Sequence, residues 1–381
     1  MSDVATFAGT KPTLLDETHR GLGAGMMDRN SWAVPMSYGN VSGEYAAVRT
    51  HGAGLIDLSS RSRIIVSGTE AVQFLNGLIT NDVKTLEVGM WMAAAFPNAQ
   101  GRLLANARVL HRADGFLFDT ESTTSEIVLK TLERFTLAGD FRVIDVTDDL
   151  AALTIQGARS KDVVERVFGS EAAEVARGRL VEAEWSGQNV CVIRATHTSE
   201  DGFDLFVPAS IVIGLWNALH VGGAEPVGYE SLEIMRIETG IPRYGVDIDV
   251  TNVVLEAGHE EAVSFTKGCY IGQEIIARIH WRGHVAKRIT GVIMADARVI
   301  QSGDNVVSID GKEIGRITSQ CVSPRLERTV ALALIKYDYL SEGTLVRIMS
   351  NDGEHGGSIV ELPFVRGSWY EAALAGSVTD T

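Results

Sequence analysis

The sequence predicts a mixed α+β protein that ends in a small β-barrel or sandwich, and three observations support this prediction. Strand-like and helix-like segments follow one another without the strict alternation that a doubly wound sheet requires. No G-x-G-x-x-G motif follows a predicted strand, which argues against a Rossmann nucleotide site. After about residue 287 the pattern changes to short alternating strands with glycine and aspartate turns, which is typical of a barrel or sandwich.

The segments before residue 287 are predicted from their periodicity and from their turn residues. Residues 61–67 read as a strand that turns at Gly68 into a helix. Residues 91–122 predict a β-meander, and residues 123–139 a capped helix. The remaining expected elements are strands within 141–157, a helix at 160–169, strands within 182–208, a helix at 210–223 and a helix ending at Gly240.

Composition excludes several classes of protein. A net charge of −15 argues against general nucleic-acid binding. No apolar stretch reaches the about 18 residues of a membrane span, and the N-terminus lacks a signal-peptide core, so we expect a cytosolic protein. The three cysteines lie far apart without a CxxC pair, and no HExxH occurs. We therefore expect no protein-held metal.

The run "KGCYIGQE" at residues 267–274 combines a lysine, a cysteine and two glycines. In an extended segment, Lys267 and Cys269 would share one face, and an ammonium beside a thiol favours the thiolate. This predicts a reactive or ligand-facing thiol with Lys267 as its partner. The alternative is a small buried cysteine that packs like alanine. The sequence leaves both interpretations open.

A cationic stripe follows this run, with basic side chains at every second position and apolar residues between them. If the segment is a strand, one face is cationic, which in an acidic chain indicates that an anionic group or partner is met there. The alternative is an edge strand protected by charge against aggregation. We favour the anion site. The stripe consists of Arg278, His280, Arg282 and His284.

Two further polar positions stand out. Glu200 lies on a turn before a strand, and Arg236 lies on a helical pattern. A carboxylate and a guanidinium near a common pocket would suit the edge of a pterin or purine, which offers adjacent donors and acceptors. The alternative is a structural ion pair or ordinary surface charge.

The run at 267–274 resembles the signature of the YgfZ family, folate-binding proteins related to the T-protein (aminomethyltransferase) of the glycine cleavage system. Other stretches resemble the wider T-protein superfamily, and residues 311–335 resemble its terminal barrel. The resemblance covers about residues 38–370. The matching stretches are 44–68, 74–83, 197–207 and 232–248.

The resemblance implies a three-lobed cloverleaf around a central tetrahydrofolate pocket. Glu200 would hold the pterin ring, Arg236 would line the pocket or hold the folate tail, and Lys267 and Cys269 would face the folate channel. It also implies a role in assembling or repairing iron–sulfur enzymes, which would be partners. The implied regions are a polar extension at 1–30, a two-lobed folate-binding region at 31–286, a barrel at 287–372 and a flexible tail at 373–381.

One departure from the aminomethyltransferases affects the expected function. Those enzymes carry a pattern like N-x-x-G-G-x-x-D-D, and this chain has "NAQGRLLAN" instead, with Ala105 and Asn106 in place of the acids. Neither side chain can ionise, although Asn106 can still hydrogen-bond a pterin. We therefore expect a tetrahydrofolate-binding YgfZ-like protein, and the alternative is a tetrahydrofolate-dependent aminomethyltransferase or methyltransferase. The expected folate-binding residues are Asn98, Arg102, Asn106, Glu200, Arg236, Tyr270, Gln273 and Glu274.

Overall fold

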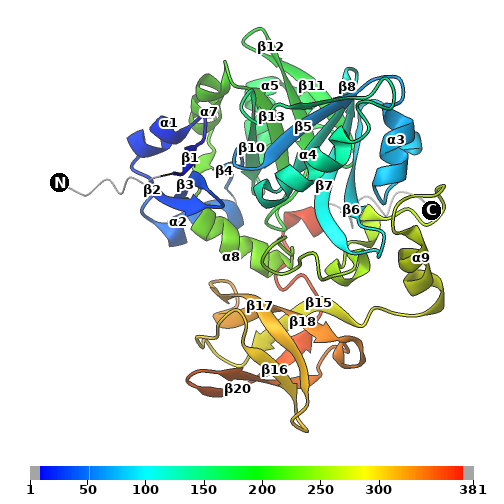
Figure 1. Ribbon diagram of the computed structural model, residues 1–381. Helices are drawn as coiled ribbons and strands as arrows, with labels where there is room; N and C mark the ends of the chain where they lie inside the picture. Colours follow the sequence, from blue (N-terminus) through cyan, green and yellow to red (C-terminus); the bar gives the residue numbers. More distant parts are fainter. Residues whose placement is uncertain (1–8, 51, 372–381) are drawn as a thin grey trace, which may run out of the picture.

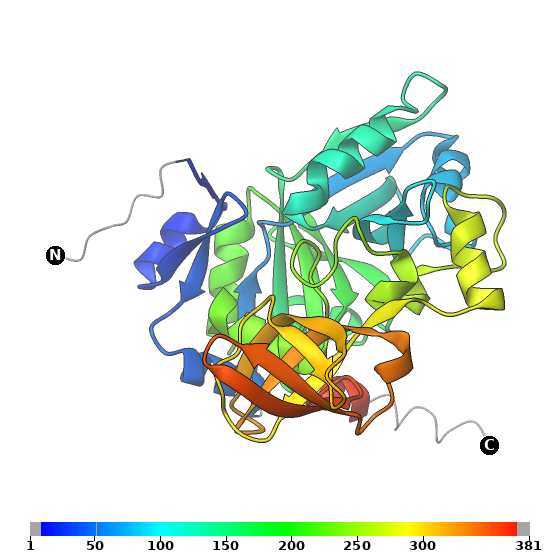
Figure 2. The ribbon, with the colours of Figure 1, turned by 60° about the horizontal axis from the view of Figure 1, so that its bottom comes forward.

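The computed structural model describes residues 9–50 and 52–371, and it has two lobes built on β-sheets above a β-barrel (Figure 1). Turning the molecule brings the barrel, coloured yellow-orange to red, to the front of the view (Figure 2). The predicted α+β class and the three-lobed arrangement are confirmed. The tail predicted at 373–381 lies outside the described residues.

The first lobe is built on a six-stranded sheet in the order β11-β12-β13-β10-β4-β14. Its central strands are buried on both faces: Leu153 and Leu205 pack with Trp216, whereas Ala152 and Phe206 pack toward the second sheet. Burial on both faces explains their nearly continuous apolar sequence. The elements are β4 (Gly54–Asp57), β10 (Leu150–Gln156), β11 (Leu180–Trp185), β12 (Gln188–Arg194), β13 (Gly202–Pro208), β14 (Glu225–Pro226), α2 (Val41–Arg49), α5 (Ser160–Phe168), α6 (Ser170–Ala173) and α7 (Val212–Val221).

The second lobe is a five-stranded sheet in the order β6-β7-β8-β5-β9. Val109 and Phe118 pack against its helices, whereas Leu110 and Leu117 join the core between the two lobes. The meander predicted over 91–122 is confirmed. The elements are β5 (Ser62–Ser67), α3 (Ala71–Leu78), β6 (Met90–Pro97), β7 (Leu103–Arg112), β8 (Gly115–Thr120), α4 (Ser125–Glu133), β9 (Arg142–Asp145) and the short 3-10 turns η1 (Val83–Thr85) and η2 (Ser122–Thr124).

The third lobe is a closed barrel in the strand order β15-β18-β17-β16-β19-β20. Closure pairs every strand on both sides and leaves no free sheet edge. After the barrel the chain returns to the first lobe, where Ser368 meets Glu200. The elements are β15 (Lys287–Met294), β16 (Asn305–Ser308), β17 (Glu313–Ser323), β18 (Arg328–Lys336), η5 (Tyr337–Tyr339), β19 (Leu345–Ser350) and β20 (Gly353–Val360).

The N-terminal segment corrects one prediction. Residues 9–30, expected to belong to a polar extension, fold against the first lobe in β1 (Lys11–Pro12), α1 (Asp16–Gly21) and β2 (Gly25–Arg29). Leu15 is fully buried, and His19 lies 3.0 Å from Asp57 and 2.8 Å from the Tyr38 hydroxyl. A few well-placed side chains therefore anchor a segment of low overall hydrophobicity. β1 and β2 form a three-stranded sheet with β3 (Trp32–Ser37) between them.

The helix α8 (Tyr229–Thr239) lies at the meeting point of the lobes, above the barrel (Figure 1). It ends at Gly240, as predicted, and packs against α2, β3, β17 and β18. Within residues 9–50 and 52–371, no helix is long and apolar enough to cross a membrane. A cytosolic location stays a prediction. The remaining elements are η3 (Val254–Ala257), η4 (Glu260–Ala262) and α9 (Gln273–Arg282).

Candidate functional site

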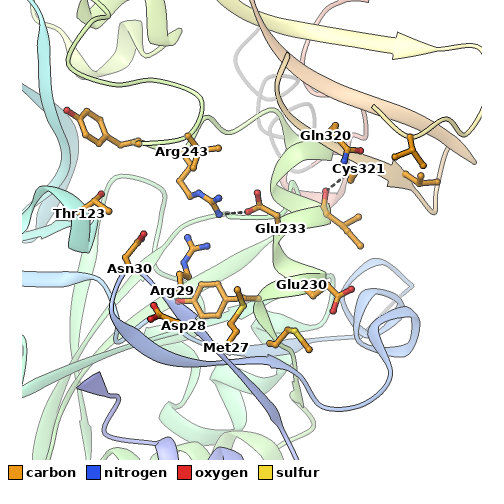
Figure 3. Close-up of a pocket in the computed structure, with 18 of the residues that line it drawn as sticks. Met27, Asp28, Arg29, Asn30, Thr123, Glu230, Glu233, Arg243, Gln320 and Cys321 are labelled. Carbon is orange, nitrogen blue, oxygen red and sulfur yellow. Dashed lines mark hydrogen bonds and ion pairs between the residues drawn. The ribbon is translucent and has the colours of Figure 1, made fainter. Parts of the chain in front are cut away.

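Two adjoining cavities lie around α8, where the two lobes meet the barrel. The outer chamber, shown in Figure 3, has a volume of about 790 Å³, and its walls come from the β2–β3 hairpin, α8, the 243–246 loop and the barrel. The inner chamber has a volume of about 110 Å³ and extends toward the sheets. We call the four residues that line both chambers the junction residues. They are Arg29, Tyr229, Glu233 and Arg243.

The wall of the inner chamber holds a buried charge network centred on Asp119. Arg61 donates to Asp119 at 2.8 Å and also pairs with Glu121, and Arg108 donates to Asp119 at 2.8 Å. Burial alone would raise the pKa of Asp119, but the Arg61 and Arg108 guanidiniums lower it to about 2. Asp119 is therefore ionised at neutral pH and holds both arginines in place.

Asp204 on β13 extends this network. Its carboxylate lies 2.9 Å from His197 Nε2 and pairs with Arg108. Burial opposes ionisation, but His197 and Arg108 lower the pKa of Asp204. His197 lines the inner chamber. Asp204 is therefore the acid of segment 197–207 that is connected to the cavity.

Glu200, the acid singled out from the sequence, lies in a different environment. Its carboxylate accepts hydrogen bonds from the Ser368 backbone N–H at 2.9 Å and the Ser368 hydroxyl at 2.7 Å, and from Arg49 at 3.1 Å. It lines neither chamber. Glu200 therefore fixes the segment that follows the barrel, and its predicted pterin contact is not supported by the geometry.

Arg236 lines the inner chamber, as the resemblance implied, but its donors are occupied. Its guanidinium donates to Glu233 at 2.6 and 3.0 Å and to Asp247 at 2.7 Å. It also donates to the Ser319 hydroxyl at 2.8 Å and the Ile241 carbonyl at 2.7 Å. An arginine has five N–H groups, and all five are used. Arg236 therefore joins α8 to the barrel strand β17 and has no donor left for a ligand.

The junction residues carry more positive charge than their one carboxylate neutralises. Arg243 donates to Glu233 at 2.7 Å, and Glu233 is also held by Arg236. The Arg29 guanidinium lies 4.6 Å from the centre of the Tyr229 ring. Burial lowers the pKa of Arg243; Glu233 opposes this, and the like charges of Arg29 and Arg236 add to it. The junction is thus an electropositive passage between the chambers.

None of the three folate-binding residues predicted in and after the "NAQG" turn lines either chamber. The Asn98 side chain accepts from the backbone N–H groups of Gln100 and Arg102, both at 2.9 Å, and so forms the turn. The Arg102 side chain donates to the Thr251 carbonyl. Asn106 lies two residues before Arg108 on β7 and shares its face, whereas Ala105 packs in the core of the second lobe. Within the described chain, the Asn106 side chain makes no hydrogen bond.

The 267–274 run is a loop that leads into a helix, so Lys267 and Cys269 do not share a face. Lys267 is 7% exposed and donates to the carbonyls of Ile79, at 2.9 Å, and Asn81. Burial lowers the pKa of Lys267 to about 8. Cys269 is exposed, and no hydrogen bond or ion pair joins the two residues in the described part of the chain. The predicted thiol–lysine pair is therefore not formed here.

The cationic stripe was predicted on a strand, and this prediction is wrong. Residues Gln273–Arg282 form α9, because Ile275, Ile276 and Ile279 follow a helical period and Gly283 ends it. In a helix, residues two apart do not share a face. His280 stacks on Phe265 at 3.6 Å, whereas His284 stacks on Tyr337 at 3.8 Å. Arg278 and Arg282 remain exposed on α9.

The other residues of the run also lie away from the cavity. Tyr270 is buried in the core beside the barrel, which raises its pKa to about 12. Gln273 and Glu274 begin α9. No residue of 265–284 lines either chamber. The run instead fastens the second lobe, because Ile271 donates its N–H to the Gly77 carbonyl at 3.1 Å and Lys267 binds the loop that follows α3.

The two glycines of the run give a test of this structural role. Gly272 has φ +78°, and an added Cβ would lie 2.4 Å from the Asn98 carbonyl oxygen; at Gly268 nothing lies within 4 Å. We expect Gly272→Ala to lower the free energy of unfolding by about 2 kcal/mol or more, since the left-handed conformation alone costs about 1–2 kcal/mol. We expect Gly268→Ala to change it by less than about 0.5 kcal/mol. Denaturant unfolding measures both, and equal effects would contradict the docking of this loop on the hairpin.

Sequence reasoning missed most of the cavity residues. Arg29 was missed because it lies in the segment taken as an extension. Arg61, Arg108 and Asp119 were missed because buried charge pairs between distant strands leave no local pattern. Asp204 had a signal, since it lies in the strand that follows Glu200 and alternates with the apolar Phe203 and Leu205.

The fold and both sequence regions match one family. The GCVT N-terminal domain matches residues 15–267, and the glycine cleavage T-protein C-terminal barrel domain matches residues 287–366. A structure titled glycine cleavage system aminomethyltransferase T from Bartonella henselae has the same fold. The two structures align with a TM-score of 0.84 and 24% sequence identity. The alignment covers 93% of this chain and 98% of the Bartonella henselae chain. These matches show that the chain contains the N-terminal domain and the C-terminal barrel domain of glycine cleavage T-proteins.

Curated relatives extend the match over nearly the whole chain. A Rubrobacter xylanophilus protein named aminomethyltransferase is 31% identical over 365 residues, covering 95% of this chain and 96% of the relative. A Streptomyces coelicolor protein of the same name is 30% identical over 363 residues, covering 93% and 97%. The chain belongs to the glycine cleavage T-protein family. The superfamily recognised from the sequence is confirmed, whereas the YgfZ subtype stays a prediction.

Proposed function

We propose that this chain binds tetrahydrofolate in the two-chamber cavity and transfers a one-carbon unit, as an aminomethyltransferase-type protein. The observation that carries the proposal is the match over 95% of the chain to a relative named aminomethyltransferase, with a ligand-sized cavity at the meeting point of the shared lobes. Of the two functions expected from the sequence, this was the alternative, and the relatives favour it over the iron–sulfur role.

The cavity residues fit a folate. The outer chamber, at about 790 Å³, lies within the range of about 300–1,000 Å³ that is usual for ligand pockets, and the inner chamber alone is too small. Tyr229, Met27 and Ile234 give aromatic and apolar walls for a flat ring. His197 and Glu121 at the inner end offer a donor or acceptor and an acceptor for the pterin edge.

The chain supplies charge at the cavity, without the acid pair that is typical of aminomethyltransferases. Burial opposes ionisation of Glu121 and Glu233, but neighbouring arginines lower the pKa of both carboxyls. Ionised carboxylates beside the reacting centre stabilise positive charge that develops on a one-carbon unit. Asn106 lines neither chamber, and its amide cannot accept a proton as a carboxylate would. Bound tetrahydrofolate would supply the nitrogen that takes up the one-carbon unit.

A turnover assay tests this proposal. The protein is incubated with tetrahydrofolate and an aminomethylated lipoyl carrier protein, and methylenetetrahydrofolate is measured. We expect formation that depends on protein concentration and is weaker in the variant His197→Ala, because His197 lies at the inner end of the cavity. Tetrahydrofolate binding without any methylenetetrahydrofolate would contradict the transferase part of the proposal.

Such an outcome would favour the second candidate, a YgfZ-like folate-binding protein that supports iron–sulfur enzymes. The specific observation in its favour is that Ala105 and Asn106 replace the acid pair while the 267–274 run keeps the YgfZ-like sequence. In this candidate, exposed Cys269 acts on a client protein and not on the folate. Cys269→Ser would then reduce the activity of client iron–sulfur enzymes in cells while leaving tetrahydrofolate binding unchanged.

A further inference from the structure

Arg29 is the junction residue whose guanidinium has no hydrogen-bonded carboxylate. Among the described residues its side chain makes no hydrogen bond and no ion pair, and the charges of Glu121 and Glu233 act on it only through space, although it lines both chambers. The other arginines of the inner chamber each hold a carboxylate: Arg61 holds Asp119, and Arg236 and Arg243 hold Glu233. A guanidinium that faces a partly enclosed cavity with its N–H groups free of any carboxylate is suited to bind an anion.

The carboxylates near Arg29 accept hydrogen bonds from other groups. Glu121 pairs with Arg61, and Glu233 accepts from both Arg236 and Arg243. Asp28 next to it accepts the Ser31 backbone N–H at 2.9 Å and lies on the exposed hairpin. Figure 3 shows the Glu230 carboxylate turned away from Arg29. The protein therefore leaves Arg29 available for a ligand.

The hairpin that carries Arg29 holds it in a fixed position. Arg29 is the last residue of β2 and pairs with Trp32, and the turn between them uses positive φ at both Asn30 (54°) and Ser31 (66°). Positive φ at both loop residues is the type I′ geometry that two-residue hairpins favour, and it fixes the register of Arg29 opposite Trp32. The Tyr229 ring supports the guanidinium from one side. Arg29 is thus pre-positioned at the passage between the chambers.

We propose that Arg29 binds a carboxylate group of the ligand at this passage. The inference rests on the proposed function and names the chemistry that the same cavity recognises. The carboxylate has two sources: the glutamyl tail of the folate, or a small carboxylate-bearing molecule that donates the one-carbon unit. A guanidinium forms two parallel hydrogen bonds to a carboxylate, and the nearby Arg243 charge strengthens the attraction.

Calorimetric titrations of the full chain test this inference. Wild type, Arg29→Gln and Arg29→Lys are titrated with tetrahydrofolate, with 6-methyltetrahydropterin, which lacks the tail, and with p-aminobenzoylglutamate, which lacks the pterin. Benzoate is titrated in the presence of tetrahydrofolate as a small carboxylate probe. Arg298→Gln is the matched control, because Arg298 also lines the outer chamber but pairs with Asp296 at 2.9 Å.

For either source of the carboxylate, we expect Arg29→Gln to lower the affinity for a carboxylate probe by about tenfold or more, which is the usual loss for a hydrogen bond to a charged group. Arg29→Lys is expected to recover part of that loss, and Arg298→Gln to change binding less than about twofold. If Arg29→Gln binds tetrahydrofolate and p-aminobenzoylglutamate more weakly but binds 6-methyltetrahydropterin as wild type does, the carboxylate comes from the folate tail. If only the binding of benzoate is weakened, the carboxylate comes from a second molecule.

The inference and the proposed function can fail separately. If wild type does not bind tetrahydrofolate, the proposed function fails. The p-aminobenzoylglutamate titration then still tests whether Arg29 binds a carboxylate. If Arg29→Gln binds every carboxylate probe as tightly as wild type does, the inference is wrong even where tetrahydrofolate binds. Circular dichroism of each variant confirms that the hairpin substitution leaves the fold intact.

Discussion

Replacing Asp119 by alanine is expected to lower the free energy of unfolding by about 3 kcal/mol, at the low end of the range for breaking a buried ion pair. Asp119 is fully buried and pairs with Arg61, which lies just before β5, and with Arg108 on β7. Without it, two guanidiniums are held close together in a poorly solvated site. Each arginine keeps one further carboxylate, Glu121 or Asp204, which limits the loss.

Denaturant unfolding measures this loss, and Asp148→Ala is the matched control. Asp148 pairs with Lys11 but its side chain is 68% exposed, so we expect a change below about 1 kcal/mol. An equal loss of stability in both variants would contradict the buried ion pairs assigned to Asp119.

The same network makes a prediction about pH. The pKa of Asp119 falls from 3.8 to about 2 on folding, so its contribution is complete above its ordinary pKa and is lost as the pH falls through about 2. The stability difference between wild type and Asp119→Asn is therefore expected to shrink between about pH 5 and pH 2. A difference that grows in this interval would contradict the assigned ion pairs.

The sequence predicted the fold well where the pattern is local. The barrel strands β16 and β19 alternate between buried and more exposed residues, and the helix ending at Gly240 carries its own stop signal. It failed at residues 278–284, where basic and apolar residues alternate over a short run and imitate a strand although the isoleucines before them follow a helical period. It also failed at residues 9–30, where Leu15 and His19 find their partners in distant strands.

The candidate site was harder to predict, because side-chain direction decides it. The family resemblance pointed to the 197–207 segment and to Arg236, and His197 and Arg236 line the inner chamber. The sequence does not show that Glu200 turns toward Ser368 while Asp204 turns inward. Arg236 lies at the cavity, yet its hydrogen bonds come from residues up to 83 positions away in the chain. Hydrogen-bond partners that are this distant in the sequence can be identified only from the folded structure.

The second large expected effect concerns the cavity itself. Val322 on β17 lines the outer chamber and is 48% exposed, so Val322→Trp adds an aromatic ring to the chamber without disturbing a core. We expect it to weaken tetrahydrofolate binding by about tenfold or more, because a filled pocket cannot bury the ligand. The matched control is Ile144→Trp on β9, where the side chain is 55% exposed and lines neither chamber.

Isothermal titration of these three proteins with tetrahydrofolate is the most direct test that the two-chamber cavity is the folate site. We expect wild type to bind with a dissociation constant below about 1 mM, Ile144→Trp to bind equally well, and Val322→Trp to bind at least about tenfold more weakly. An absence of binding to wild type, or equal binding by all three proteins, would contradict this assignment of the folate site.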